Sequence, residues 1–303
     1  MMETNPMDAQ AVMQADGEQA GAARCAYWAE QMQRGYDVVQ DVLRFPVEEC
    51  GEPFASLRDA AATAAVEMQF SETRIAGTLE RVFFMRESLV RRVVDVGRAL
   101  NARGWILKIE DAYRSLEMQR QLVLKPAVFD AILDKCIWEC GGRLPPVELV
   151  ARRSIVLIAN IPKIGTHMSG SAIDISVLRR DDGTEVWRGE PYLHMSERTP
   201  MRSPFVEPAA LANRLAITDV LEAHGFIHFP FEFWHYNQDD ALGHVVSGTR
   251  EPARFGPVEW DPATNRVERC ANPLEPLNAL DVIERELQAA LERARQAEAP
   301  RAG

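Results

Sequence analysis

"GTHMSGSAIDIS", residues 165–176, places His167 and Asp174 seven positions apart, with small residues and a serine pair between them. Its second half continues into "AIDISVL", residues 172–178, whose β-branched side chains predict a strand that carries Asp174. "SIVLIAN", residues 154–160, has a similar composition and predicts another strand just before the motif. A single His–Asp pair is a weak indication of a site, so partners must come from elsewhere in the chain.

Such partners occur in "FIHFPFEFWHYN", residues 226–237, which predicts an aromatic strand interrupted by Pro230, and therefore an edge or bulged strand. Glu232 and His235 are three positions apart and would point to opposite faces of a flat strand, so we expect a bulge or twist between them. A catalytic zinc typically has three protein ligands and a nearby carboxylate that is not a ligand. His167, Asp174, His235 and Glu232 together supply that set.

These residues carry a resemblance to a known family. The pattern His-x-x-Gly-x-Ala-x-Asp at residues 167–174, Glu-x-Trp-His at residues 232–235 and "DAYR" at residues 111–114 are similar to three signatures of zinc D-alanyl-D-alanine dipeptidases and related D,D-carboxypeptidases. The motifs occur in the family's order, and the resemblance covers residues 75–240. It implies the D,D-peptidase, hedgehog-like zinc fold.

The resemblance also implies roles for individual residues. His167, Asp174 and His235 would bind one zinc ion per chain, with Glu232 as the general base and Arg114 stabilising the oxyanion. The chemistry agrees with these roles, because zinc acidifies water and a positioned carboxylate can accept its proton. Arginine suits the last task because its guanidinium keeps its charge.

The sequence departs from the family at two positions that concern the substrate. Gly165 stands where the family usually has serine, which leaves Thr166 as the neighbouring hydroxyl, and His194 in "LHMS" stands where the dipeptidases tend to have aspartate. We therefore predict substrate contacts from Thr166, His194 and Trp234, the last as a wall of the pocket.

The order of predicted elements indicates an α+β fold, with a central sheet of short strands and helices mainly on one side. Besides the strands above, we predict a strand over residues 105–114 and helices near residues 89–100, 115–123, 129–140 and 208–224. The predicted organisation is a disordered tail (1–24), a helical N-terminal extension (25–74), the zinc peptidase domain (75–249) and a C-terminal extension with an amphipathic helix (250–303).

Composition limits the partners. The chain has 303 residues, 47% of them hydrophobic, and a formal net charge of −11, which argues against nucleic acid or an anionic membrane surface as a partner. Neither a membrane span nor a signal peptide is indicated, so we expect a cytoplasmic protein with a small peptide substrate. The five cysteines predict free thiols. The apolar stripe of the C-terminal helix predicts either packing on the domain or a homodimer.

The function predicted from the sequence is zinc-dependent hydrolysis of a short D-amino-acid-containing peptide, of the D-Ala-D-Ala dipeptidase type. Two alternatives stay open: a D,D-carboxypeptidase that acts on muropeptides, and a non-catalytic zinc-binding module. The residues do not distinguish dipeptidase from carboxypeptidase.

Overall fold

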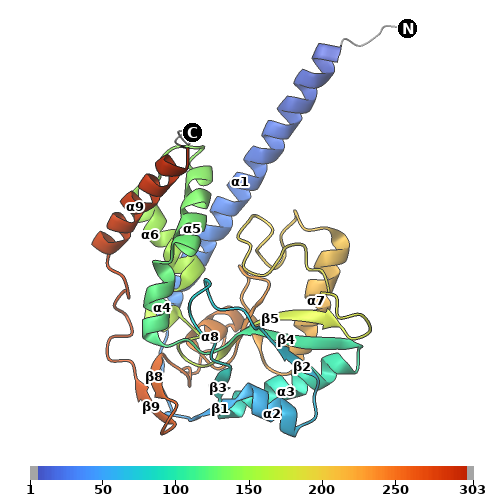
Figure 1. The fold of residues 1–303 in the computed structure, drawn as a ribbon, viewed down its shortest axis with the longest axis vertical. Coiled ribbons are helices and arrows are strands. Elements are labelled where there is room, and N and C mark those ends of the chain that lie inside the picture. The colour runs from blue at the N-terminus through green and yellow to red at the C-terminus, as the bar shows by residue number, and fades with distance from the viewer. Residues whose placement is uncertain (1–5, 299–303) are drawn as a thin grey trace, which may run out of the picture.

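The computed structural model describes residues 6–298 (Figure 1). The helices are α1 (Pro6–Arg44), α2 (Leu57–Thr63), α3 (Glu87–Asn101), α4 (Leu116–Val123), α5 (Pro126–Glu139), α6 (Val147–Ile158), the short 3₁₀ helix η1 (Pro162–Ile164), α7 (Pro208–Ala223), α8 (Ala241–Ser247) and α9 (Leu280–Glu298). The strands are β1 (Phe54–Ser56), β2 (Met68–Phe70), β3 (Phe84–Arg86), β4 (Trp105–Asp111), β5 (Ala172–Arg179), β6 (Ile227–His228), β7 (His235–Asn237), β8 (Val258–Asp261) and β9 (Arg266–Arg269).

A mixed five-stranded sheet with the order β2-β4-β5-β7-β6 forms the centre of the molecule. β2 runs parallel to β4, and every other neighbouring pair is antiparallel. The two longest strands, β4 and β5, are those predicted around residues 105–114 and 172–178. The α+β class predicted from the sequence is confirmed.

One face of the sheet is covered by α3 and α7 (Figure 1). Ile173 and Ile175 of β5 are fully buried there, in one cluster with Val93 of α3 and Ile217 of α7. Because successive side chains of a strand point to opposite faces, Asp174 lies on the other face. The sheet thus separates an apolar core from a polar surface on which a site can be built.

A second apolar cluster joins α1, α5, α6 and α9, which lie side by side in Figure 1. Trp28 of α1 and Phe129 of α5 are both fully buried in it. Ile283 and Leu287 of α9 pack into the same cluster, so the stripe of the C-terminal helix is used within the chain. The apolar surface on which the predicted homodimer rested is therefore occupied by α5 and α6.

Two segments differ from their predictions. Residues 154–158 form the end of α6, and the predicted strand over 154–160 is wrong, because Val150, Ser154 and Leu157 are buried at helical spacing against the neighbouring helices. Residues 6–24, predicted as part of a loose tail, lie in α1; Ala, Gln and Met favour a helix there. Residues 1–5 lie outside the described part of the chain.

Segments from both predicted extensions contact the predicted peptidase domain of residues 75–249. β2, from the range 25–74, pairs with β4 in the central sheet, and α9, from the range 250–303, packs against α5 and α6. Within residues 6–298, no helix is long and apolar enough to cross a membrane.

Candidate metal centre

Three neighbouring strands bring polar side chains into one row on the face of the sheet opposite α3. Asp174 of β5 pairs with His235 of β7 on one side and with Asp111 of β4 on the other. The register between β4 and β5 shifts after Ile109, so Asp111, and not Glu110, faces Asp174. Such a bulge changes the direction of the side chains that follow it. The register of the three strands therefore places Asp111, Asp174 and His235 next to one another.

His167 comes from the loop between η1 and β5. In that loop Gly170 has a φ of +67°, and a Cβ atom there would lie 2.3 Å from the Phe54 ring, so only glycine fits. The fully buried Arg86 donates from Nε to the carbonyl oxygen of Ser169 at 2.7 Å. These contacts fix the loop and with it the position of His167.

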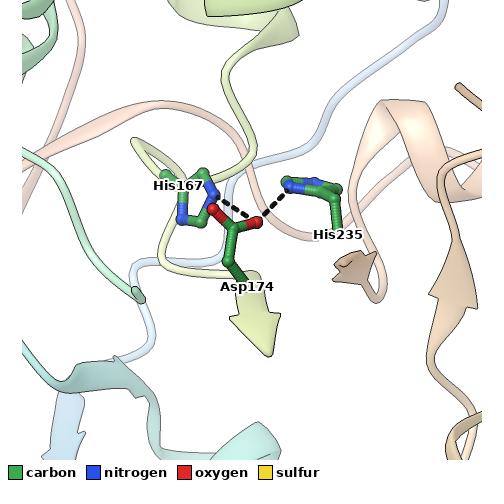
Figure 2. Close-up of side chains that lie close together, drawn as sticks. All are labelled: His167, Asp174 and His235. Atoms are coloured by element: carbon green, nitrogen blue, oxygen red, sulfur yellow. Dashed lines mark hydrogen bonds and ion pairs between the residues drawn. The ribbon is translucent and has the colours of Figure 1, made fainter. Parts of the chain in front are cut away.

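His167, Asp174 and His235 form a buried cluster, and Figure 2 shows the carboxylate between the two imidazoles. Asp174 Oδ1 is 3.3 Å from His167 Nε2 and 3.0 Å from His235 Nδ1, and one ligand atom from each residue lies within 4.8 Å of the others. In a tetrahedron with zinc–ligand bonds of about 2.0–2.1 Å, neighbouring ligand atoms are about 3.3 Å apart. The cluster therefore has a spacing close to that of three zinc ligands.

The remaining nitrogen of each imidazole has a partner outside the cluster. His167 Nδ1 donates to the carbonyl oxygen of Ala112 at 2.5 Å, and His235 Nε2 lies 2.8 Å from Thr166 Oγ1. With these nitrogens protonated, His167 Nε2 and His235 Nδ1 present lone pairs toward Asp174, as metal ligands must. The hydroxyl of Thr166 contacts His235 and so orients a predicted ligand, a different role from the substrate contact predicted for it.

Burial has opposite consequences for the two kinds of ligand. It lowers the pKa of His235, which favours the neutral imidazole that can bind a metal. Burial alone would raise the pKa of Asp174, but His167 and His235 outweigh it and hold the pKa well below its ordinary value. Burial thus favours a neutral His235 imidazole beside an ionised Asp174 carboxylate, and two imidazoles with one carboxylate are a donor set that fits zinc.

Arg114 lies beside the cluster. Its Nε donates to Asp111 Oδ2 at 2.7 Å, its Nη2 lies 3.5 Å from Asp174 Oδ2, and its Nη1 donates to Gln119 at 3.3 Å. Burial would lower the pKa of Arg114, but Asp111 and Asp174 raise it above its ordinary value. The guanidinium is therefore a fixed positive charge next to the predicted metal ligands.

Tyr192 is a member of the site that the sequence did not reveal. Its hydroxyl donates to Asp174 Oδ2 at 2.9 Å, and burial together with the charge of Asp174 raises its pKa well above the ordinary value. With Oδ2 occupied by Tyr192 and Arg114, Oδ1 faces the two imidazoles. Tyr192 is two positions before His194, but nothing in "PYLHMS" distinguishes it from any other loop tyrosine.

Glu232 lies in the connection between β6 and β7, which is a pair of tight turns and not the single aromatic strand that was predicted. The amide of Glu232 donates to Phe229 at 3.2 Å, and the amide of His235 donates to Glu232 at 3.3 Å. These turns allow Glu232 and His235 to reach the same site. Burial and the charge of Asp174 raise the pKa of Glu232 to about 8, against the opposing effect of Arg114.

A cavity of about 80 Å³ joins these groups. Its polar side holds the three cluster residues together with Arg114, Thr166, Glu232 and Trp234. Its apolar side includes Val39 and Val42 of α1, residues 155–158 of α6 and Ala159, which follows α6. Trp234 lies in the wall where it was predicted. His194 lies outside this wall: its Nδ1 is 2.6 Å from Glu190 Oε2, and it lines a neighbouring cavity.

Buried nitrogen and oxygen donors beside a carboxylate and a fixed guanidinium are an arrangement typical of metal-dependent hydrolases. Residues 145–251, which include the three cluster residues and Glu232, match the Peptidase M15 family, described as D-ala-D-ala dipeptidase. Over these residues the chain is similar to that metallopeptidase family.

Several curated proteins named D-alanyl-D-alanine dipeptidase are similar to this chain. The protein from Synechocystis is 24% identical over 72% of this chain and 96% of its own length. Those from Enterococcus faecalis and Escherichia coli are 28% and 33% identical over 30% and 26% of this chain. These two matches span 45% and 41% of the relatives' own lengths.

A solved structure of the LdcB LD-carboxypeptidase is also similar to this chain, with a TM-score of 0.34 and 15% identity. The likeness covers 74% of this chain and 84% of the LdcB chain.

Proposed function

We propose that this protein is a zinc-dependent peptidase that hydrolyses a short peptide containing D-amino acids, with D-Ala-D-Ala as the reference substrate. The observation that carries the proposal is the single cavity in which His167, Asp174 and His235 meet Glu232 and Arg114. The similarity to proteins named D-alanyl-D-alanine dipeptidase supports the choice of substrate.

His167 Nε2, Asp174 Oδ1 and His235 Nδ1 would hold one zinc ion per chain. When bound, zinc supplies Lewis acidity, which polarises a carbonyl group and makes water more acidic. Three protein ligands leave room for a further ligand, as in catalytic sites, whereas structural zinc sites have four protein ligands. The hydrogen bond that His167 Nδ1 donates to the Ala112 carbonyl oxygen and the one between His235 Nε2 and the Thr166 hydroxyl would orient the two histidines.

Glu232 and Arg114 would carry out the proton transfer and the charge stabilisation. The Glu232 carboxylate accepts a proton from the attacking water, whose oxygen forms a bond to the peptide carbonyl carbon. The C–N bond then breaks, and the proton passes from Glu232 to the leaving amine. Arg114 stabilises the negative charge that develops on the carbonyl oxygen, since Asp111 and Gln119 hold its guanidinium in place.

The site favours a peptidase over a non-catalytic zinc-binding module. A structural zinc ion needs neither a base nor a guanidinium, yet Glu232 and Arg114 both line the cavity of the cluster. The raised pKa of Glu232 and the fixed charge of Arg114 are features that a hydrolytic reaction uses.

The proposal is tested with the purified full chain, first stripped with a chelator and then supplied with one equivalent of zinc. We expect release of D-alanine from D-Ala-D-Ala that depends on zinc, and much slower release of L-alanine from L-Ala-L-Ala. Equal turnover of both stereoisomers would contradict the predicted substrate class. An absence of hydrolysis across D,D-, L,D- and L,L-dipeptides would contradict the proposed activity.

A further inference from the structure

A cavity of about 470 Å³ lies where the hairpin of β8 and β9 packs against β1, β3 and the start of α4, elements that lie close together in Figure 1. We call it the hairpin cavity, because Trp260 and Pro262 of that hairpin line it together with Phe84, Tyr113 and Met118. Of the residues that the structure describes, none lines both this cavity and the metal cavity, and every lining residue lies outside the family match of residues 145–251. The hairpin cavity is therefore separate from the predicted reaction site.

One wall of the hairpin cavity consists of aromatic rings that hold one another in place. The centroid of the Trp260 ring lies 5.0 Å from that of Phe54 and 4.8 Å from that of Phe84. Tyr113 meets Trp260 edge-on at 5.6 Å, and Trp260 Nε1 donates to Asn265 Oδ1 at 2.8 Å. Trp260 and Phe84 are only partly buried, so apolar ring surface stays accessible. Rings that are already fixed can bind a planar apolar group with little loss of conformational freedom.

The charged side chains that line the hairpin cavity are those of Arg58 and Arg81, and no carboxylate of the described residues lines it. The charge of Arg81 is balanced within the protein. Its Nη1 donates to the carbonyl oxygen of Glu110 and lies 3.7 Å from Asp111 Oδ2. Arg58 therefore supplies the positive charge that is available to a ligand.

Arg58 is held in a way that leaves its hydrogen-bond donors free. It is exposed, and it forms no ion pair or side-chain hydrogen bond with a residue in the range 21–298. Its guanidinium carbon lies 4.5 Å and 4.7 Å from the ring centroids of Phe70 and Phe83. Such stacking uses the face of the guanidinium, and the N–H groups in its plane can bind a carboxylate. Ser56 and Ser115 also line the cavity, and each hydroxyl accepts a backbone N–H and keeps its own proton to donate.

From these features we propose that the hairpin cavity binds a small organic anion with a planar apolar ring system, an aromatic carboxylate. The ring lies against Trp260 and Phe84, and the carboxylate binds Arg58. The cavity volume is within the range of about 300–1,000 Å³ of small-molecule sites, which are mostly apolar with a few placed polar groups. A cationic ligand would meet two arginines, and a neutral ring would leave Arg58 without a partner.

The proposal is tested by calorimetry with the purified full chain and naphthoate, a planar aromatic carboxylate, as the probe. We expect saturable binding at one site per chain with a submillimolar Kd. Naphthalene methanol, which lacks the charge, should bind at least tenfold more weakly. Decalin carboxylate has the same carbon skeleton without a flat ring and should bind several-fold more weakly. Equal affinities for the three compounds, or no saturable binding of naphthoate, would overturn the site.

Arg58 is tested by substitution. Arg58→Gln should raise the Kd of naphthoate at least tenfold and leave the melting temperature close to that of wild type. Arg91→Gln is the matched control, because Arg91 is exposed on α3 and lines neither cavity; it should leave the Kd unchanged. Arg58→Glu should bind the cationic naphthylmethylammonium more tightly than wild type does. Equal effects of the two glutamine variants, or no change of preference in Arg58→Glu, would overturn the contact between Arg58 and the anion.

Two measurements separate the hairpin cavity from other binding modes. Naphthoate should have the same Kd in chelator-treated and zinc-loaded protein, and binding that requires zinc would place the carboxylate on the metal and overturn the site. Wild type and Arg58→Glu should sediment alike. Self-association that Arg58→Glu abolishes would make the cavity an interface between two copies of this chain, which would overturn the small-ligand assignment. Because these results do not depend on turnover, they stand apart from the proposed peptidase activity.

Discussion

The two walls of the metal cavity come from regions built on different principles. The wall from the central sheet holds charged and polar groups in places set by strand register, such as Asp111 and His235 on either side of Asp174. The opposite wall comes from α6, whose Val156 and Leu157 belong to the helical cluster, and from α1, whose Val39 and Val42 belong to a separate apolar cluster. The difference suggests that the sheet side performs the chemistry and the helical side limits what can enter.

Glu232→Gln should have the largest effect on turnover, because it removes the proton acceptor and keeps nearly the same shape. We expect kcat for D-Ala-D-Ala to fall by about 10²- to 10⁴-fold, the usual contribution of a general base. Zinc content and melting temperature should stay close to those of wild type. Loss of zinc in this variant would instead mean that Glu232 is a metal ligand, and its assignment as the general base would be wrong.

Arg114→Lys should have a smaller effect. Lysine keeps the positive charge but cannot reproduce the bonds of one guanidinium to Asp111, Asp174 and Gln119. We expect kcat/KM to fall by about 10- to 100-fold with zinc retained, less than the 10²- to 10³-fold typical when an oxyanion donor is removed outright. Steady-state kinetics and metal analysis on the same samples check this. Unchanged kcat/KM would mean that Arg114 only supports the fold.

Leu287→Ala tests the helical side, where the expected effect on turnover is the smallest. Leu287 is 4% exposed in the helical cluster, so its truncation should lower the free energy of unfolding by about 2–5 kcal/mol. The turnover of the folded protein should remain unchanged. Leu280→Ala on the same helix is the control, because Leu280 is 49% exposed and should have little effect on stability. Chemical denaturation and kinetics below the transition measure both properties.

A similar loss of stability for both leucine variants would contradict the packing of α9. A large loss of turnover in folded Leu287→Ala would show that the helical cluster participates in the chemistry, and the contrast between the two walls would fail.

The sequence predicted the sheet side better than the helical side. "AIDISVL" and "WILKIED" form β5 and β4 as predicted, since their β-branched side chains favour strands. "SIVLIAN" was misassigned because a short apolar run does not distinguish a buried strand from a buried helix. Only packing against α1 and α5 makes it the end of α6.

Within the site, the motifs predicted the residues that the structure brings together, His167, Asp174, His235, Glu232 and Arg114. The sequence could not predict Tyr192, because its contact with Asp174 depends on how a loop folds over the sheet. His194 was placed by alignment with a family motif, and the structure turns it toward Glu190 and a neighbouring cavity. Local sequence motifs thus predicted the residues of the metal site. The contacts that Tyr192 and His194 make depend on packing between distant segments of the chain.

Metal content is the most direct test of the central assignment, that His167, Asp174 and His235 hold a catalytic zinc ion. Elemental analysis of protein purified without added metal should find one zinc per chain in wild type and in Glu232→Gln. The double variant His167→Ala, His235→Ala should contain almost none, because a single remaining carboxylate binds zinc weakly. Full zinc occupancy in the double variant would contradict the assignment.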